Sequence, residues 1–279
     1  MVSVDQRPNV DAFELIEHRR NVRRSRTRRV VIGAVGILVL LLAWQVAAML
    51  LNDAVILPSF IQTAHSFVHY WDNPYPSQSK PLWYDIVVSL RRILVGFVIG
   101  VVIGVAIGAA MSANQVLRQL IDPVVEVIRP LPPLAFIPLL IVWFGIGELP
   151  KEVLIVFGVV PIMVIATVAA LDEVPDDLIL AGRVLGASRW YTLLHVQLRA
   201  ALPGILVGMR ISMAGAWTSI VAAEMLAATS GLGYLIAQAG DFLQTSIALA
   251  GIIAIAIIGL LLDAGLRGLL VLADPSRRG

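Results

Sequence analysis

A polar stretch interrupts this very apolar sequence at residues 176–203, and its side chains are the first candidates for chemistry. It reads DDLILAGRVLGASRWYTLLHVQLRAALP and carries Arg183, Arg189, His195 and Arg199. Apolar residues recur at helical spacing on both sides of Gly186, where the pattern breaks. So polar a segment needs water on at least one side. We therefore predict two short helices joined by a glycine bend, lying outside the apolar spans.

The residue types that usually perform catalysis or hold metals do not gather anywhere in the sequence. Cysteine is absent, which excludes disulfides, thiol catalysis and thiolate metal sites. His65 and His69 are four residues apart, as two ligands on one helix face would be, but no third ligand follows nearby. We interpret them as a solvated or interfacial pair, and we predict neither a catalytic residue nor a metal site.

A nucleotide-binding loop of the form G-x-x-x-x-G-K-[ST] is also missing from the sequence. Such a loop needs a lysine after glycine, and the two lysines adjoin prolines instead, Lys80 before Pro81 and Lys151 after Pro150. We predict no cofactor in this chain. If ATP drives the protein, a partner subunit binds the ATP and its Mg.

The composition indicates a protein of the bilayer. Hydrophobic residues make up 58% of the 279, charged residues 14%, and the mean hydropathy is +0.87, whereas soluble domains carry roughly 25% charged residues. Several windows exceed the roughly 18–20 apolar residues that cross a bilayer core of about 30 Å. We predict an all-α polytopic membrane protein with about six transmembrane helices.

Arginines at the two ends set the predicted orientation. Residues 1–29 hold eight arginines directly before the apolar run at 30–51, so the positive-inside rule makes them a basic cytoplasmic tail. This explains the arginines without nucleic acid, and residues 10–16 suit a short amphipathic helix on anionic lipid. The apolar run is too long for a cleavable signal. The last residues, 273–279, form a second cytoplasmic tail, and the transmembrane domain occupies 30–272.

The other spans and loops follow from the apolar runs between these tails. The second span is predicted at about 86–111, and the third starts near Pro123 and runs through a proline-rich stretch. A turn at 145–152 follows, and the fourth span ends at about 170. The fifth and sixth spans are predicted at 203–226 and 246–271. Residues 52–81 and 227–243 are predicted outside, and a short loop at 112–121 inside. Arg91 and Arg92 disagree with a simple charge count, because they fall near the outer end of their span.

Small residues recur every four positions in two spans. Such stripes let a neighbouring helix approach closely, so we predict packing faces and assign them no ligand. The stripes are Gly96, Gly100, Gly104 and Gly108, and Gly204, Gly208, Ser212 and Ala216.

The third span contains Pro130, Pro132, Pro133 and Pro138. Each proline removes a backbone donor, so the helix must kink or unwind. Non-helical backbone at membrane depth is tolerated only inside protein or beside a water-filled cavity. A cavity-lining break and a kinked packing helix both remain open.

The motif LAGRVLGAS followed by VQLRAALP resembles the cytoplasmic coupling segment of bacterial ABC importer permeases. That family usually shows Glu-Ala-Ala, three residues, Gly, nine residues and Ile-x-Leu-Pro. Leu180 stands where the family usually has Glu, and Arg199 where it has Pro. The resemblance implies that residues 176–203 contact an ATPase subunit, chiefly through Leu180, Ala181, Gly182, Gly186, Ala187, Ser188, Val196 and Leu198.

Four further motifs resemble the branch that handles nitrate, sulfonates, taurine or bicarbonate. They are ILPS at 56–59, SLRRILVGF at 89–97, RPLPPLAFIPLLIVWFGIG at 129–147 and AWTSIVAAEMLAATSGLGYLI at 216–236. The resemblance implies a type I ABC importer permease in the bacterial inner membrane, a transport subunit and not an enzyme. It also implies ABC ATPase subunits, a second permease copy or paralogue, and an extracytoplasmic substrate-binding protein.

Three other interpretations stay open. Related permeases carry neutral or aromatic solutes such as a thiamine-precursor pyrimidine. A secondary transporter often has inverted repeats and ionisable pairs at the midplane, and no clear repeat is visible. An intramembrane enzyme needs a nucleophile and a base, and no such arrangement is recognisable.

Charged residues inside the spans are the candidates for the translocation path. Intramembrane arginines usually face a cavity or a carboxylate, and Glu126 and Glu224 are the available carboxylates. Arg92 or Arg129 would then hold an anion weakly on its way inward. In the structural alternative, Arg91 and Arg92 reach the outer headgroups and a glutamate neutralises Arg129.

Overall fold

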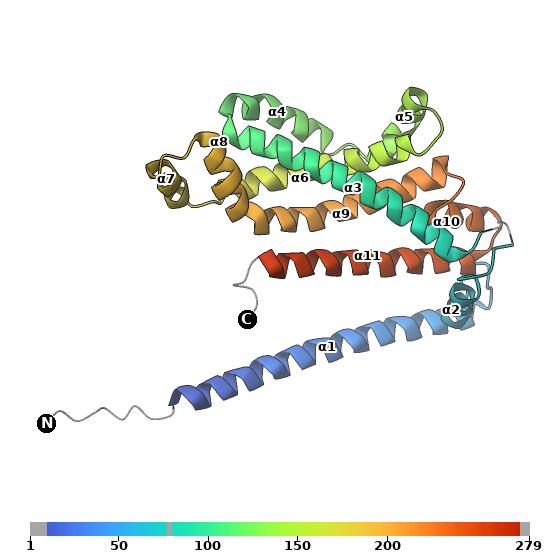
Figure 1. Cartoon of the computed structure of the whole chain (residues 1–279). Coiled ribbons are helices and arrows are strands. Elements are labelled where there is room, and N and C mark those ends of the chain that lie inside the picture. The colour runs from blue at the N-terminus through green and yellow to red at the C-terminus, as the bar shows by residue number, and fades with distance from the viewer. Residues whose placement is uncertain (1–9, 77–79, 274–279) are drawn as a thin grey trace. The chain divides into compact units, whose positions relative to one another are not determined.

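The structure, a computed structural model, describes residues 10–76 and 80–273, with the backbone alone at 10–27, 29 and 30 (Figure 1). The described residues form helices and turns without strands, which confirms the all-α prediction. The chain divides into two compact units, Met1–Thr63 and Ala64–Gly279. Parts of both predicted tails, residues 1–9 and 274–279, lie outside the described residues.

The first unit is dominated by α1 (Val10–Leu51), one continuous helix that includes the predicted span at 30–51. The stretch predicted as an amphipathic helix is its first two turns. Trp44 fixes the chain that follows: its Nε1 donates to the carbonyl of Pro58 at 3.0 Å, and its ring meets Phe60 edge-on. The predicted loop at 52–81 contains a helix, α2 (Phe60–His69).

The second unit is a helical bundle built on three long helices, α3 (Leu82–Ala113), α6 (Leu149–Asp172) and α9 (Leu198–Ala227). Figure 1 shows them side by side, and α6 packs against both of the others. Their core includes Phe97, Ile155, Met163 and Ile220. The short α10 (Leu232–Asp241) and the long α11 (Thr245–Ala273) pack against each other and against α9.

The glycine stripe of α3 lies directly on α6, which confirms the predicted packing face. A Cβ on Gly96 would lie 2.7 Å from the Cβ of Ile155, and a Cβ on Gly100 would lie 2.8 Å from the Cβ of Val159. Real Cβ atoms essentially never come so close, so only glycine permits this separation of the two helices. On α9, Gly204 approaches the Cβ of Ala170 in the same way.

The proline-rich span is broken, as predicted. Helix α4 (Gln115–Ile128) ends before the prolines, a 3-10 turn covers Pro133–Phe136, and α5 (Ile137–Phe144) leaves at 90° to α4. The predicted loop at 112–121 is wrong, since only Asn114 separates α3 from α4. Asn114 Oδ1 accepts from the amides of Val116 at 2.9 Å and Leu117 at 3.3 Å, and this N-cap starts α4 at once.

The fifth span is longer than predicted. The helix α7 (Asp176–Val184) is short, as expected, but α8 (Arg189–Thr192) continues through a π-helical turn (Leu193–Gln197) into α9. The second short helix of the prediction is therefore the start of a 39-residue helix, Arg189–Ala227. The prediction located the span by its apolar residues, and a helix can extend past them into water.

The described residues contain five helices long and apolar enough to cross a membrane, or six if α4 and α5 form one broken span. This agrees with the prediction of about six transmembrane helices.

Candidate functional site

Gly186 ends α7 and turns the chain toward α8. Its φ is +82°, in the left-handed region that favours glycine. The Gly186 amide donates to the carbonyl of Arg183 and the Ala187 amide donates to that of Gly182, both at 3.0 Å, the two bonds of a Schellman motif. A Cβ on Gly186 would meet nothing within 4 Å, so the position needs glycine for its backbone and not for space.

Ser188 begins the next helix two residues later. Its Oγ accepts from the Tyr191 amide at 3.2 Å and caps α8. Gly182 of α7 faces Thr192 across this bend, with 3.4 Å between the position of its Cβ and the Thr192 side chain. The two helices are therefore fixed against each other by short contacts on either side of Gly186.

The predicted coupling residues surround this bend with different exposure. Leu180, Ala181, Gly186 and Ser188 are exposed, whereas Gly182, Ala187, Val196 and Leu198 are half-buried. Large apolar side chains beside them are also open to the surroundings: Leu180 is 60% exposed and Leu185 86%. Exposed apolar side chains on a polar segment are typical of a surface that another protein covers.

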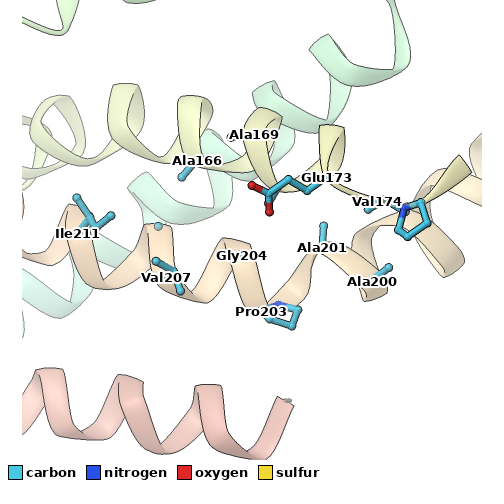
Figure 2. A pocket seen from close by; sticks show the side chains of 13 residues that line it. Ala166, Ala169, Glu173, Val174, Ala200, Ala201, Pro203, Gly204, Val207 and Ile211 are labelled. Carbon is cyan, nitrogen blue, oxygen red and sulfur yellow. The ribbon is translucent and has the colours of Figure 1, made fainter. Parts of the chain in front are cut away.

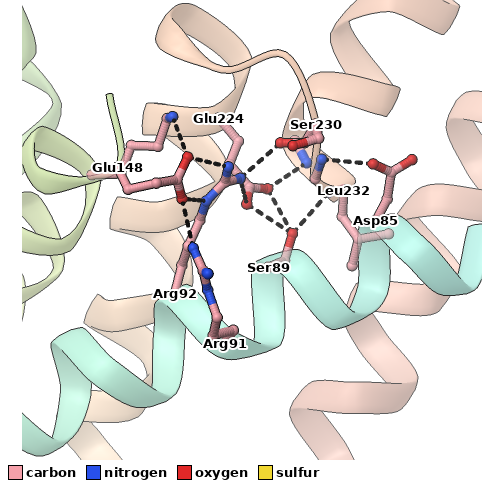
Figure 3. A network of polar contacts seen from close by, with 11 residues as sticks. Asp85, Ser89, Arg91, Arg92, Glu148, Glu224, Ser230 and Leu232 are labelled. Carbon is pink, nitrogen blue, oxygen red and sulfur yellow. Dashed lines mark hydrogen bonds and ion pairs between the residues drawn. The ribbon is translucent and has the colours of Figure 1, made fainter. Parts of the chain in front are cut away.

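At the opposite end of α3, Arg92 and Glu224 meet in the interior (Figure 3). Arg92 is 2% exposed and Glu224 0%. Arg92 Nη1 donates to Glu224 Oε1 at 2.8 Å and to the Ser230 carbonyl at 2.7 Å, while Nε and Nη2 donate to Glu148. Every guanidinium nitrogen of Arg92 has a partner.

The same network extends to the start of α10. Ser89 Oγ lies 2.8 Å from both carboxylate oxygens of Glu224 and accepts from the Leu232 amide at 2.9 Å. The Gly231 amide donates to Asp85 Oδ1 at 2.7 Å. Gly231 has φ +115°, and a Cβ there would collide with the Glu224 carboxylate. The network thus joins α3, α9, the start of α6 and the start of α10.

Glu148 is the exposed edge of this network. Its carboxylate accepts from Arg92, from Arg91 at 3.2 Å and from Lys151 Nζ at 3.1 Å. The hydrogen bonds from Arg92 contribute most to holding the pKa of Glu148 at about 2, below its usual 4.5. Arg92 is buried and paired with two glutamates, so it does not reach outward to headgroups as the structural alternative expected.

Arg129 has a different environment. It follows the last residue of α4, it is exposed, and its guanidinium makes no ion pair or hydrogen bond with the residues that the structure describes. Glu126 is also exposed and forms no ion pair with Arg129. The structural alternative, in which a glutamate neutralises Arg129, is therefore wrong for the described residues. Arg129 lines a cavity of about 210 Å³ together with Phe136, Phe157 and Thr218. The broken span therefore borders a cavity. Of the two interpretations of its prolines, this favours the cavity-lining break over the kinked packing helix.

A second cavity, of about 460 Å³, lies between the end of α6 and the start of α9 (Figure 2). Its walls are mostly small residues such as Ala166, Ala170 and Gly204. Glu173 is the one charged residue among those lining it, so this cavity offers an anion no positive partner. Among the described residues no three His, Asp or Glu side chains come close enough for a metal, and His65 and His69 simply stack.

Residues 98–278 match the family model of the binding-protein-dependent transport system inner membrane component. The chain belongs to this family. It is similar to the taurine transport system permease protein TauC of Escherichia coli (strain K12), with 39% identity over 261 residues that cover 91% of this chain and 94% of the relative. It is also similar to the nitrate import permease protein NrtB of Synechocystis sp., with 33% identity over 255 residues, 90% of this chain and 91% of the relative.

The solved structure of the MetNI methionine ABC transporter in an inward-facing conformation supports the fold of this permease. The match has a TM-score of 0.57 and 23% identity, and it covers 69% of this chain and 94% of that chain. The type I importer fold and the taurine, sulfonate and nitrate branch predicted from the sequence are confirmed. Permease subunits of this family are not enzymes, and a separate subunit hydrolyses ATP.

Sequence reasoning missed part of the network in this permease. Arg92 and Glu224 were both named, but Glu148, Asp85 and Ser89 were not. Glu148 falls in the stretch predicted to be a turn, at 145–152, where a charged side chain is common. The available signal was the position of Asp85 and Ser89, seven and three residues before Arg92 on the same helical face, inside an apolar span.

Proposed function

We propose that this permease imports a small oxyanion, such as nitrate, taurine or another sulfonate, or bicarbonate. The observation that carries the proposal is Arg129, an unneutralised cation at a helix break, facing a cavity. The names of the relatives support the same solute class, since they include taurine and nitrate permeases. The chain would be the membrane-spanning subunit of an ATP-driven importer.

The cavity at the helix break suits a weak station on the path. At about 210 Å³ it is smaller than the roughly 300–1,000 Å³ of pockets for drug-sized ligands, so it favours a small solute. Unwound backbone inside a membrane protein needs such a cavity, and a charge there marks ion pathways. Since Arg129 has no carboxylate partner in the described part of the chain, it would be able to bind an anion and to release it.

The rest of the importer follows from the family. A substrate-binding protein would deliver the solute outside, and ABC ATPase subunits with ATP and Mg would contact residues 176–203 inside. A second permease, identical or a paralogue, would complete the path. Both termini would lie in the cytoplasm, in keeping with the arginines near them.

One observation favours a second candidate, a neutral aromatic solute such as a thiamine-precursor pyrimidine. Phe136 and Phe157 stack at the wall of the cavity, with ring centroids 5.3 Å apart and an interplanar angle of 14°. Aromatic faces bind flat rings as readily as they pack together.

Arg129→Gln in the reconstituted importer tests the proposal. A charge-assisted hydrogen bond contributes about 1.5–3 kcal/mol, so uptake of taurine or nitrate should fall about tenfold or more. Folding and ATP hydrolysis stimulated by the binding protein should persist, because Arg129 is exposed and unpaired.

Arg91→Gln is the matched control, an exposed arginine that does not line the cavity, and it should transport normally. Unchanged anion uptake in Arg129→Gln would overturn the oxyanion path. Uptake of a pyrimidine by both variants, with no anion uptake by the unmodified importer, would establish the second candidate instead.

A further inference from the structure

A third cavity, of about 800 Å³, lies between the α3–α4 junction and the segment formed by α7, α8 and the π-helical turn. Its polar lining comes from both sides and includes Ser112, Asn114, Gln115, Arg183, Arg189 and Gln197. The two sides are far apart in the sequence and meet at one end of the bundle. A ligand held here would bridge them.

The charge in this cavity is not balanced. Neither Arg183 nor Arg189 has a guanidinium hydrogen bond or ion pair with the residues that the structure describes, and no Asp or Glu is among the lining residues. The nearby arginine on α4 differs, because Arg118 is paired with Asp172 at 2.8 Å. Two arginines that line one cavity without a carboxylate partner among the described residues can both donate hydrogen bonds to an anion held there.

The remaining polar groups can also donate hydrogen bonds. Gln115 and Gln197 carry side-chain amides, and the buried Ser112 Oγ has no hydrogen-bond partner among the residues that the structure describes. The start of α4 lies at the same wall, where its helix dipole is positive. Arginines bind phosphate-like groups through paired N–H donors, and hydroxyl and amide donors complete such sites.

We propose that this cavity binds the oxyanion of a phosphate or sulfonate group and that the bound anion links the α7–α8 segment to the α3–α4 junction. Two sources supply that chemistry. One is the headgroup of an acidic phospholipid, since the cavity adjoins the end of the α3 span. The other is a free anion from the cytoplasm, where the proposed topology puts this end.

The experiment uses the permease with its ATPase in nanodiscs of phosphatidylcholine, with or without phosphatidylglycerol. Inorganic sulfate is the free-anion probe, with the thermal unfolding midpoint as readout, and native mass spectrometry counts retained phosphatidylglycerol. The variant Arg183→Gln/Arg189→Gln is compared with Arg199→Gln, an exposed arginine of the same segment that does not line the cavity. The single variants are measured beside the double one, so that a folding failure of the latter leaves the test intact.

We expect sulfate to stabilise the unmodified protein and Arg199→Gln, or both proteins to retain phosphatidylglycerol. The double variant should need about tenfold more sulfate for the same stabilisation, or should lose the lipid. A response to sulfate alone identifies a free anion, and retained lipid that sulfate does not displace identifies a headgroup. Equal responses in all variants would overturn the site. So would loss of ATPase co-purification by the double variant in phosphatidylcholine without sulfate, because the arginines would then contact the ATPase. Sulfate bound at Arg129 on the proposed path would stabilise all variants equally, so only the difference between the double variant and Arg199→Gln reports this cavity.

Discussion

The buried ion pair of Arg92 and Glu224 is the most demanding arrangement among individual residues. Removing two charges from water is costly, and the pair is tolerated because Glu148, Ser89 and the Gly233 amide satisfy the remaining donors and acceptors. Such a cluster fixes the geometry of the four elements that supply it. Its members should therefore respond as a unit when one is changed.

Glu224→Gln should lower the stability of the permease by about 3–5 kcal/mol, the usual cost of leaving one charge of a buried pair uncompensated. Arg92→Gln should have a similar effect, and the double variant should lose less than the sum. Thermal unfolding in detergent measures all three. Arg91→Gln, whose side chain is 62% exposed, should change stability by no more than about 1 kcal/mol. If the single variants are stable and lose only transport, Arg92 would instead belong to the translocation path.

Glu148 adds a pH dependence to the same network. Its folded pKa of about 2 lies below the ordinary 4.5, so the ionised carboxylate stabilises the fold fully above about pH 4.5. That contribution is lost as the pH falls from about 4.5 towards 2. The unfolding midpoint of the unmodified permease should thus exceed that of Glu148→Gln at neutral pH, and the gap should close across this acid window. A gap that stays constant down to pH 3 would contradict the assignment.

At the scale of elements, the segment from α7 to α9 combines a bend that favours glycine with a continuous helix. Gly186 sets the direction of α7 through its positive φ, whereas the π-helical turn keeps α8 continuous with α9. Any displacement of α7 is therefore passed to a helix that runs through the core. The proposed contact with the ATPase depends on this bend.

Gly186→Val should leave the permease in the membrane but reduce coupled transport, because a β-branched residue at this φ costs about 1 kcal/mol or more. It should also weaken co-purification with the ATPase, or let ATP hydrolysis proceed without the binding protein. Gly186→Asn is the control, since asparagine tolerates the left-handed region and the site has open space. Normal coupling in Gly186→Val would show that the bend does not govern contact with the ATPase.

Spacing patterns within single segments of the sequence predicted much of the architecture of the whole molecule. Contacts between residues far apart in the sequence could not be predicted from such patterns. The stripe at Gly96 and Gly100 and the prolines of the broken span each lie within one stretch of sequence, so spacing alone reveals them. The start of α4 was missed because Asn114 is both a loop former and a good N-cap. Arg92 and Glu224 are 132 residues apart in the chain, and no spacing rule can pair them.

Single cysteines test the orientation of the whole permease. A cysteine at Asp72, exposed between α2 and α3, should react with an impermeant thiol reagent added to intact cells. One at Leu185, which is 86% exposed beside Gly186, should react only after the membrane is opened. The native chain has no cysteine, so the background is clean. Labelling of both from the same side would rule out the proposed topology.

The close glycine contacts between α3, α6 and α9 also have a mechanical consequence. Helices whose backbones are in close contact have little room to slide past each other. We therefore expect α3, α6 and α9 to tilt together as one rigid body. With 24 residues, α6 is about 36 Å long, so a tilt of roughly 10° at one end moves the other end by about 6 Å. A small displacement near Gly186, if it tilts α6, would thus become a shift of several ångströms at Glu148, at the other end of that helix.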